Sequence, residues 1–207
     1  SLPFPAWNLV DVSAYRSTWR ERHGYFSMNM ATTRGCPYHC NWCAKPIWGQ
    51  RYHARSPENV VSELSWLKRT YAPDHIAFAD DILGLKPAWI QRFAQLVEEK
   101  DARVPFKSLH RVDLLLKGDT IPALARAGAR TVWVGAESGS QKVLDAMDKG
   151  STVEAARELR GAEVVAAVEL SDRFISGRQL PDKAVDLLDT AAARVKIAKS
   201  SRPAVID

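Results

Sequence analysis

Short apolar runs alternate with longer amphipathic stretches from about residue 26 to residue 150. This alternation predicts repeated strand-helix units around a parallel sheet. A helix signal follows each expected strand. The strands are expected at residues 26–32, 75–80, 104–110 and 131–136. The sequence therefore predicts an α/β fold, a partial (β/α) barrel of about four parallel strand-helix units, followed by an α-helical C-terminal segment.

The helix signals have recognisable ends. Ser56 and Pro57 open one helix as N-cap and first-turn proline. Its apolar face is expected to carry Val60, Leu64, Leu67 and Tyr71. A second helix opens at Pro87, a third ends at Gly128 as a left-handed cap, and a fourth opens at Ser140. The apolar and aromatic residues at helical spacing are assigned to the core.

Polar residues follow the expected strands at the points where those strands end. Asp80 and Asp81 end the second strand, Arg111 follows the third, and Glu137 and Ser138 end the fourth. The loop after the first strand carries all the cysteines. In (β/α) barrels the active side chains gather at the C-terminal ends of the strands. We therefore expect these groups to meet at one rim.

Composition is that of one globular domain with a sizeable core: 207 residues, 46% hydrophobic and 26% charged. The net charge of +5 comes from scattered Lys and Arg, without a run of five like charges. A solvated basic surface explains this charge, so binding to nucleic acid is unsupported. No signal-peptide pattern and no run of 18 apolar residues occurs. A cytoplasmic protein without membrane contact is expected, and free thiols suit that reducing compartment.

The three cysteines lie together as C-x3-C-x2-C, at Cys36, Cys40 and Cys43. Three thiolates within eight residues can wrap one metal centre, whereas a disulfide would leave one thiol over. Iron-sulfur cubanes normally take four Cys, so three would leave one iron open to another ligand. The alternative is a structural zinc loop that borrows a distant His, because His39 is too cramped to serve.

The stretch at residues 29–55, NMATTRGCPYHCNWCAKPIWGQRYHAR, resembles the signature of radical S-adenosylmethionine (SAM) enzymes. It is similar to the branch that carries an upstream cobalamin-binding domain. The resemblance implies a [4Fe-4S] cluster on Cys36, Cys40 and Cys43, SAM on the open iron, and a 5′-deoxyadenosyl radical that abstracts hydrogen. It also implies methyl transfer or rearrangement on a small organic substrate, cobalamin from a domain outside this stretch, and an electron donor such as a flavodoxin or ferredoxin.

The resemblance assigns further SAM contacts. Trp42 would lie near the adenine, although it could instead only shield the cluster from water. Asp80 and Asp81 would hold the SAM amine, since paired carboxylates suit an ammonium group; the alternative is a helix-capping pair. An apolar run ending in two Asp also occurs in ATPases. The chain has no G-x4-G-K-[ST] motif, so nucleotide hydrolysis lacks a phosphate-binding loop.

Three more residues enter through the same resemblance. Glu137 and Ser138 would hydrogen-bond the SAM ribose or carboxylate, with a plain N-cap as the alternative for Ser138. Arg111 could pair with the SAM carboxylate through its fork of donors. An Arg at such a rim is as often a salt-bridge partner, so both interpretations stay open.

Residues 164–198 resemble a different family, the small helical subdomain of Clp-type AAA+ ATPases. The resemblance lies in AAVELSDRFISGRQLPDKAVDLLDTAAARV, where helices are expected at about residues 163–173 and from residue 181 onward. Without a phosphate-binding loop we interpret these helices as packing elements that cover the open edge of the last strand. A seam is expected at residues 150–165, whether from a natural fusion, a mis-joined frame or a constructed sequence.

The expected organisation is a linker at residues 1–25, a partial radical SAM core at 26–150 and a helical segment at 151–207. The leading hypothesis is a radical SAM enzyme. A second is a truncated or chimeric chain that binds a cluster without turnover, or that serves only as a helical interaction module. A third, an AAA+ ATPase fragment, is disfavoured by the missing phosphate-binding loop.

Overall fold

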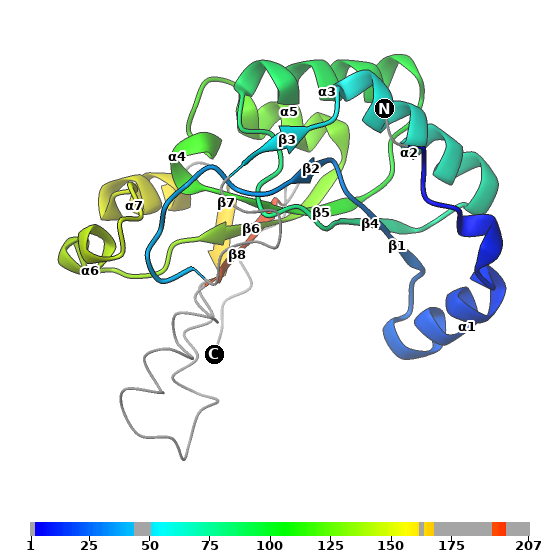
Figure 1. Cartoon of the computed structure of the whole chain (residues 1–207), viewed down its shortest axis with the longest axis horizontal. Coiled ribbons are helices and arrows are strands. Elements are labelled where there is room, and N and C mark those ends of the chain that lie inside the picture. Colours follow the sequence, from blue (N-terminus) through cyan, green and yellow to red (C-terminus); the bar gives the residue numbers. More distant parts are fainter. Residues whose placement is uncertain (1–2, 44–50, 162–163, 168–191, 198–207) are drawn as a thin grey trace.

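The computed structural model describes residues 3–43, 51–161, 164–167 and 192–197. Its centre is a six-stranded sheet in the order β1-β4-β5-β6-β8-β7 (Figure 1). The first four strands in that order run parallel to their neighbours. They are β1 (Ser27–Met30), β4 (His75–Phe78), β5 (Phe106–His110) and β6 (Ala129–Gly135). The predicted α/β fold with four parallel strands is confirmed, and the strand bounds differ from expectation by at most two residues.

Three helices lie along one face of this sheet (Figure 1). They are α2 (Pro57–Tyr71), α3 (Pro87–Glu99) and α5 (Thr120–Ala127). The expected caps are present: the Ser56 side chain accepts a hydrogen bond from the Asn59 amide, and Gly128 takes a left-handed φ of 109°. These local signals fix where α2 begins and where α5 ends.

The core lies between the three helices and the parallel strands. On α3, Phe93, Leu96 and Val97 are buried, as their helical spacing predicts. The Phe78 ring of β4 meets Phe106 at 5.0 Å and Phe93 at 6.1 Å between centroids, both edge to face. Burying a side chain of this size contributes about 2 kcal/mol. This packing fixes the sheet whose strand ends carry the candidate site.

The segment expected to be a linker contains two helices, η1 (Trp7–Leu9) and α1 (Val12–His23). Asp11 caps α1 by accepting from the Ala14 amide, and Gly24 ends it at φ 76°. The Tyr15 ring packs on Phe26 at 6.0 Å between centroids. No residue of α1 is fully buried, but Val12, Tyr15 and Trp19 pack half-buried against the core along one narrow stripe. The domain limits at residues 25 and 150 stay a prediction.

Three short helices follow β5 and β6: α4 (Val112–Leu115), α6 (Gln141–Ala146) and α7 (Val153–Gly161). Helix α6 confirms the helix expected after Ser140, although it ends four residues before Gly150. Helix α7 is described up to Gly161 and leads towards the C-terminal strands. Figure 1 shows α6 and α7 beyond the end of β6, away from the α2–α3–α5 layer.

The C-terminal residues described by the structure are strands, β7 (Val164–Ala167) and β8 (Ala192–Ile197). At these positions the prediction of helices was wrong; the rest of both predicted helices lies outside the described residues. Strand β8 pairs antiparallel with β6, and β7 pairs antiparallel with β8. A parallel sheet that ended at β6 would leave the backbone groups of that edge unpaired. The edge is covered as expected, but by a strand.

None of the helices in the described part of the chain is long and apolar enough to cross a membrane.

Candidate functional site

The three cysteines lie in a loop, residues 35–43, that we call the cysteine loop. It leaves the end of β2 (Thr33–Arg34), which pairs antiparallel with β3 (His53–Ala54). Gly35, at φ 82°, turns the backbone into the loop. All three thiols are free: Cys36 is half-buried, Cys40 is buried and Cys43 is exposed.

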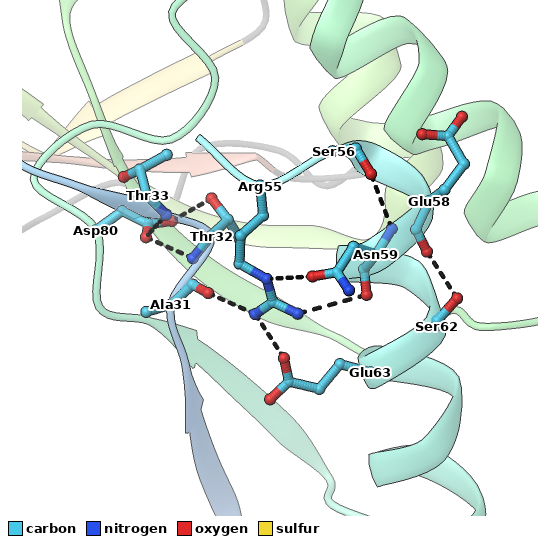
Figure 2. A network of polar contacts seen from close by, with 10 residues as sticks. All are labelled: Ala31, Thr32, Thr33, Arg55, Ser56, Glu58, Asn59, Ser62, Glu63 and Asp80. Atoms are coloured by element: carbon cyan, nitrogen blue, oxygen red, sulfur yellow. Dashed lines mark hydrogen bonds and ion pairs between the residues drawn. The ribbon is translucent and has the colours of Figure 1, made fainter. Parts of the chain in front are cut away.

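The first anchor of this region is Asp80, at the end of β4. Its Oδ1 accepts hydrogen bonds from the amides of Thr32 and Thr33 at 2.7 and 2.8 Å, and its Oδ2 accepts from the Thr32 hydroxyl at 2.7 Å (Figure 2). Burial raises the pKa of this carboxyl, although the Thr hydrogen bonds act to lower it. Asp80 thus ties the end of β1 to the end of β4, a role that neither the SAM-amine prediction nor the capping alternative anticipated.

A second network braces the same strand end from the side of α2. Arg55 donates to the Ala31 carbonyl at 2.8 Å and to Asn59 Oδ1 at 2.6 Å, and its Nη1 lies 2.5 Å from Glu63 Oε2 (Figure 2). Glu63 is 1% exposed, and burial raises its pKa while Arg55 lowers it. A cavity of about 450 Å³ opens beside this network. No local pattern in the sequence indicates these contacts, which join the residue after β1, helix α2 and Arg55 in the segment between them.

Arg111, directly after β5, holds the middle of the cysteine loop. Its guanidinium carbon lies 3.7 Å from the centroid of the Tyr38 ring. Its Nε donates to Asp113 Oδ1 at 2.8 Å, and its Nη2 donates to the carbonyls of Lys149 and Gly150 at 2.8 and 3.2 Å. The structure therefore places the Arg111 donors on protein acceptors, as the salt-bridge interpretation expects, and stacks the side chain on the loop.

The residues after β6 hold the end of the loop. Glu137 Oε1 accepts from Lys149 Nζ at 2.7 Å, and the two side chains are 6% and 9% exposed. Lys149 Nζ also lies 5.7 Å from the centroid of the Trp42 ring. Asn41, next to Trp42, donates from its backbone to the Met147 carbonyl at 3.0 Å. The loop is thus tied to the segment that follows α6.

Among the described residues, Asp81 and Ser138 are not tied to the cysteine loop by the contacts that hold Asp80 and Glu137. Asp81 is exposed, and it lies close enough to Cys36 to affect that thiol. Burial is the largest cause that raises the pKa of Cys36, and the charges of Asp81, Cys40 and Cys43 raise it further. Ser138 Oγ accepts from the Ser140 amide at 3.1 Å, next to the start of α6. Asp81 is therefore the carboxylate of the pair that a bound cation could reach.

The strand ends and the cysteine loop come together as expected at one rim. Asp80 ties in β4, Arg111 ties in β5, and the Glu137–Lys149 pair ties in β6. Sequence reasoning missed Lys149, Tyr38 and Asn41. Their only local signal is position, because Tyr38 and Asn41 lie between cysteines and Lys149 follows α6.

The residues of the cysteine loop have the chemistry that an iron-sulfur cluster requires. Among residues 3–43 and 51–161, no group of three or more His, Cys, Asp and Glu side chains is placed to hold a single metal ion. A cubane makes a different demand, because each thiolate binds its own iron. Three free thiols share one loop, and Cys40 and Cys43 lie close enough to Cys36 to raise the pKa of its thiol. The Trp42 Nε1 is buried without a hydrogen-bond partner in the described structure, as are the indole nitrogens of Trp7 and Trp19, and a ligand at this loop could supply its acceptor. The residues fit the group.

Comparison with protein families gives two matches. The model of the radical SAM superfamily matches residues 30–163, and that of an AAA lid domain matches residues 156–207. The two matches overlap at residues 156–163, inside the range where the sequence predicts a seam. The C-terminal match agrees with similarity to the chaperone ClpB of Dichelobacter nodosus, 57% identical over 44 residues, which cover 21% of this chain and 5% of that protein.

The N-terminal region is similar to an uncharacterised methyltransferase of Pyrococcus horikoshii. The two are 27% identical over 152 residues, which cover 73% of this chain and 32% of that protein. The chain thus spans about a third of the length of the curated relatives it matches there.

A solved structure with a similar fold is that of the radical SAM methyltransferase TsrM of Kitasatospora setae, with cobalamin and a [4Fe-4S] cluster bound. The TM-score is 0.55 at 21% identity, and the match covers 73% of this chain and 28% of that one. At this identity the similarity concerns the fold alone.

Proposed function

The chain belongs to the radical SAM superfamily, and we propose that it forms the core of an enzyme that binds a [4Fe-4S] cluster and SAM. Cys36, Cys40 and Cys43 would hold the cluster. SAM would lie at the same rim, against the ends of the parallel strands. When bound and reduced, the cluster would supply one electron for cleavage of SAM into methionine and a 5′-deoxyadenosyl radical, the species that would take hydrogen from the substrate.

One observation carries this proposal: a single loop with three free thiols is fastened to the carboxyl ends of three parallel strands. The fastening uses Asp80 before the loop, Arg111 on Tyr38 within it, and Lys149 beside Trp42 at its end. Preorganised ligands lose little conformational entropy when they bind. A loop needed only for chain connection would not require this many long-range anchors.

The chain's own residues then have separable tasks. The Trp42 indole N–H would donate to the nucleoside or to the cluster sulfur, which would satisfy an otherwise unpaired buried donor. The exposed carboxylate of Asp81 would receive the SAM amine. Glu137, with Oε1 held by Lys149, would offer Oε2 to the ribose or the amine. Asp80, Arg111 and Ser138 would act on the backbone around the site rather than on SAM.

Cobalamin dependence is the finer part of the proposal. Its support is that the TsrM structure, which has a similar fold, holds cobalamin. Methyl transfer is supported by the name of the P. horikoshii relative, an uncharacterised methyltransferase. Methyl transfer or rearrangement on a small organic substrate would follow, with cobalamin supplied by a domain outside these residues. A small redox protein, a flavodoxin or a ferredoxin, would provide the electron. The exposed position of Cys43 suits electron entry at that side of the loop.

A second candidate rests on the AAA lid match at residues 156–207. A chain in which this segment stands in place of further barrel strands could bind a cluster without turnover, or serve as an interaction module. The absence of a phosphate-binding loop from the sequence leaves an ATPase fragment without support.

Anaerobic reconstitution with iron and sulfide separates the two candidates. The product is incubated with SAM and dithionite, and 5′-deoxyadenosine is measured by chromatography, with a Cys40→Ser variant as the matched control. Formation of 5′-deoxyadenosine by the wild-type chain alone supports the enzyme. A cluster that forms without SAM cleavage supports the non-catalytic candidate and contradicts the first.

A further inference from the structure

Lys149 was not expected at the site, yet it lies at the centre of the contacts there. We propose that Lys149 is a positioning residue for SAM: it fixes Glu137 and Trp42 in the orientations that bind the nucleoside. This inference rests on the proposed function. It concerns a residue that the sequence analysis left unassigned.

The ion pair between Lys149 and Glu137 is buried, with 9% and 6% of the two side chains exposed and 2.7 Å between Nζ and Oε1. Removing two charges from water costs several kcal/mol per ion, and a packed apolar pair is often as stable. The pair is therefore poor as a stabilising device. The geometry of the pair is better explained by a role in positioning the Glu137 side chain and the Trp42 ring.

Glu137 has a backbone that needs holding. Its φ is 59°, and the amide of Ser138 donates to the Ala136 carbonyl at 2.7 Å, so Glu137 is the centre of a three-residue turn. A non-glycine residue in a sparsely populated conformation is strained and persists only when its surroundings determine it. The contact to Lys149 helps to fix this conformation, because it holds Oε1 of the Glu137 side chain at 2.7 Å from a buried ammonium group.

Gly135 leaves the space that the pair occupies. A Cβ at this position would lie 2.6 Å from Glu137 Oε1 and 2.8 Å from Lys149 Nζ. Both distances are too short for a real contact, so any larger residue would displace one of the charged atoms. Glycine, which has no Cβ, is therefore the residue that fits beside this ion pair at the end of β6.

Lys149 also reaches the loop itself. Its Nζ lies 5.7 Å from the centroid of the Trp42 ring, within the range of a cation–π contact. The Trp42 indole nitrogen is buried and has no acceptor in the described structure. One ammonium group thus lies beside two residues proposed to bind the nucleoside, Trp42 on the loop and Glu137 after β6.

The backbone of Lys149 is fixed in turn. Its amide donates to the Leu144 carbonyl at 3.1 Å, and its carbonyl accepts from Arg111 Nη2 at 2.8 Å. Asp148 and Gly150 on either side have left-handed φ values of 52° and 63°. The ammonium group therefore extends from a rigid turn, which is what a positioning residue requires.

The test compares wild type with Lys149→Met, Lys149→Arg and the exposed control Lys142→Met, each reconstituted anaerobically with iron and sulfide. Iron content and thermal unfolding are measured first, and then the dissociation constant for radiolabelled SAM by equilibrium dialysis. We expect Lys149→Met to keep its iron but to bind SAM about tenfold more weakly, which corresponds to about 1.4 kcal/mol. Lys149→Arg should recover part of the loss, and Lys142→Met should bind as wild type does.

Gly135→Ala provides a second perturbation, because it displaces the pair and leaves both charges present. Should Lys149→Met fail to fold, several-fold weaker SAM binding by Gly135→Ala at normal iron content supports the proposal. Wild-type affinity in whichever of the two variants folds overturns it and leaves the proposed function standing. A wild-type chain that takes up the cluster but does not bind SAM overturns both.

Discussion

Gly135→Ala is the substitution whose effect on stability the structure defines most closely. The new Cβ would lie 2.6 Å from Glu137 Oε1 and 2.8 Å from Lys149 Nζ. Both atoms end flexible side chains, but both side chains are nearly buried and bonded to each other. They cannot move away without leaving preferred rotamers or separating the charges, so overpacking should cost about 1–3 kcal/mol.

One effect opposes this cost. Gly135 is absent from the positive-φ residues of the described chain, so alanine fits its backbone and restricts the unfolded chain, a gain of about 0.4–1 kcal/mol. The net destabilisation should be about 1–2 kcal/mol. Gly139→Ala is the matched control, because its added Cβ would meet nothing within 4 Å and its φ is also not positive. That variant should be neutral or slightly stabilised.

Urea unfolding followed by tryptophan fluorescence measures the difference. With a slope of about 2 kcal/mol per molar urea, the midpoint of Gly135→Ala should fall by about 0.5–1 M relative to wild type. A midpoint for Gly135→Ala equal to or above that of Gly139→Ala would refute the reasoning, because it would mean that the ion pair does not occupy the space beside Gly135.

Three more outcomes follow from the same structure. Asp80→Ala leaves two buried amides and a hydroxyl without their acceptor, so its free energy of unfolding, measured in urea, should fall by about 3 kcal/mol or more. Asp81 is exposed, and Asp81→Ala should change the free energy of unfolding by less than about 0.5 kcal/mol. Burial lowers the pKa of His110 to about 3, so between pH 6.5 and pH 3 only the unfolded chain binds a proton at this residue. The free energy of unfolding should therefore fall by about 1.4 kcal/mol for each pH unit lost in that window. His110→Gln should show a smaller loss of stability between about pH 6.5 and pH 5. Hydrogen exchange at residues 131–135 should be slow, because β6 pairs with strands on both sides; exchange as fast as in exposed loops would show that β8 does not cover this edge.

Local signals account for the parts of the fold that the sequence predicted. Ser56 and Pro57 mark the start of α2, and Gly128 marks the end of α5, because caps act within one helical turn. Helix α1 was missed because its apolar stripe is narrow: Val12, Tyr15 and Trp19 lie at helical spacing, but they are only half-buried against the core, and polar and charged residues fill most of the rest of the helix. The C-terminal strands were missed because β8 is defined by its partner β6, about 60 residues earlier in the chain, and not by its own pattern.

The candidate site likewise has a part that is local in the sequence and a part that is not. The spacing of the three cysteines is local, so the loop could be found from the sequence. The anchors are not local: Tyr38 meets Arg111, and Trp42 meets Lys149, across more than 70 residues in each case. No periodicity links such positions. Asp80 shows a further limit, because its residue type suggested a ligand for SAM while its three hydrogen bonds give it a structural task.

The central claim is that Cys36, Cys40 and Cys43 hold an iron-sulfur cluster with one iron open to SAM. Electron paramagnetic resonance of the anaerobically reconstituted and reduced chain tests it most directly, with and without SAM. The account predicts a [4Fe-4S] signal whose g-values change when SAM is added, and no such signal from variants in which any of the three cysteines is replaced by serine. A chain that binds zinc tightly and shows no iron-dependent spectrum would contradict it.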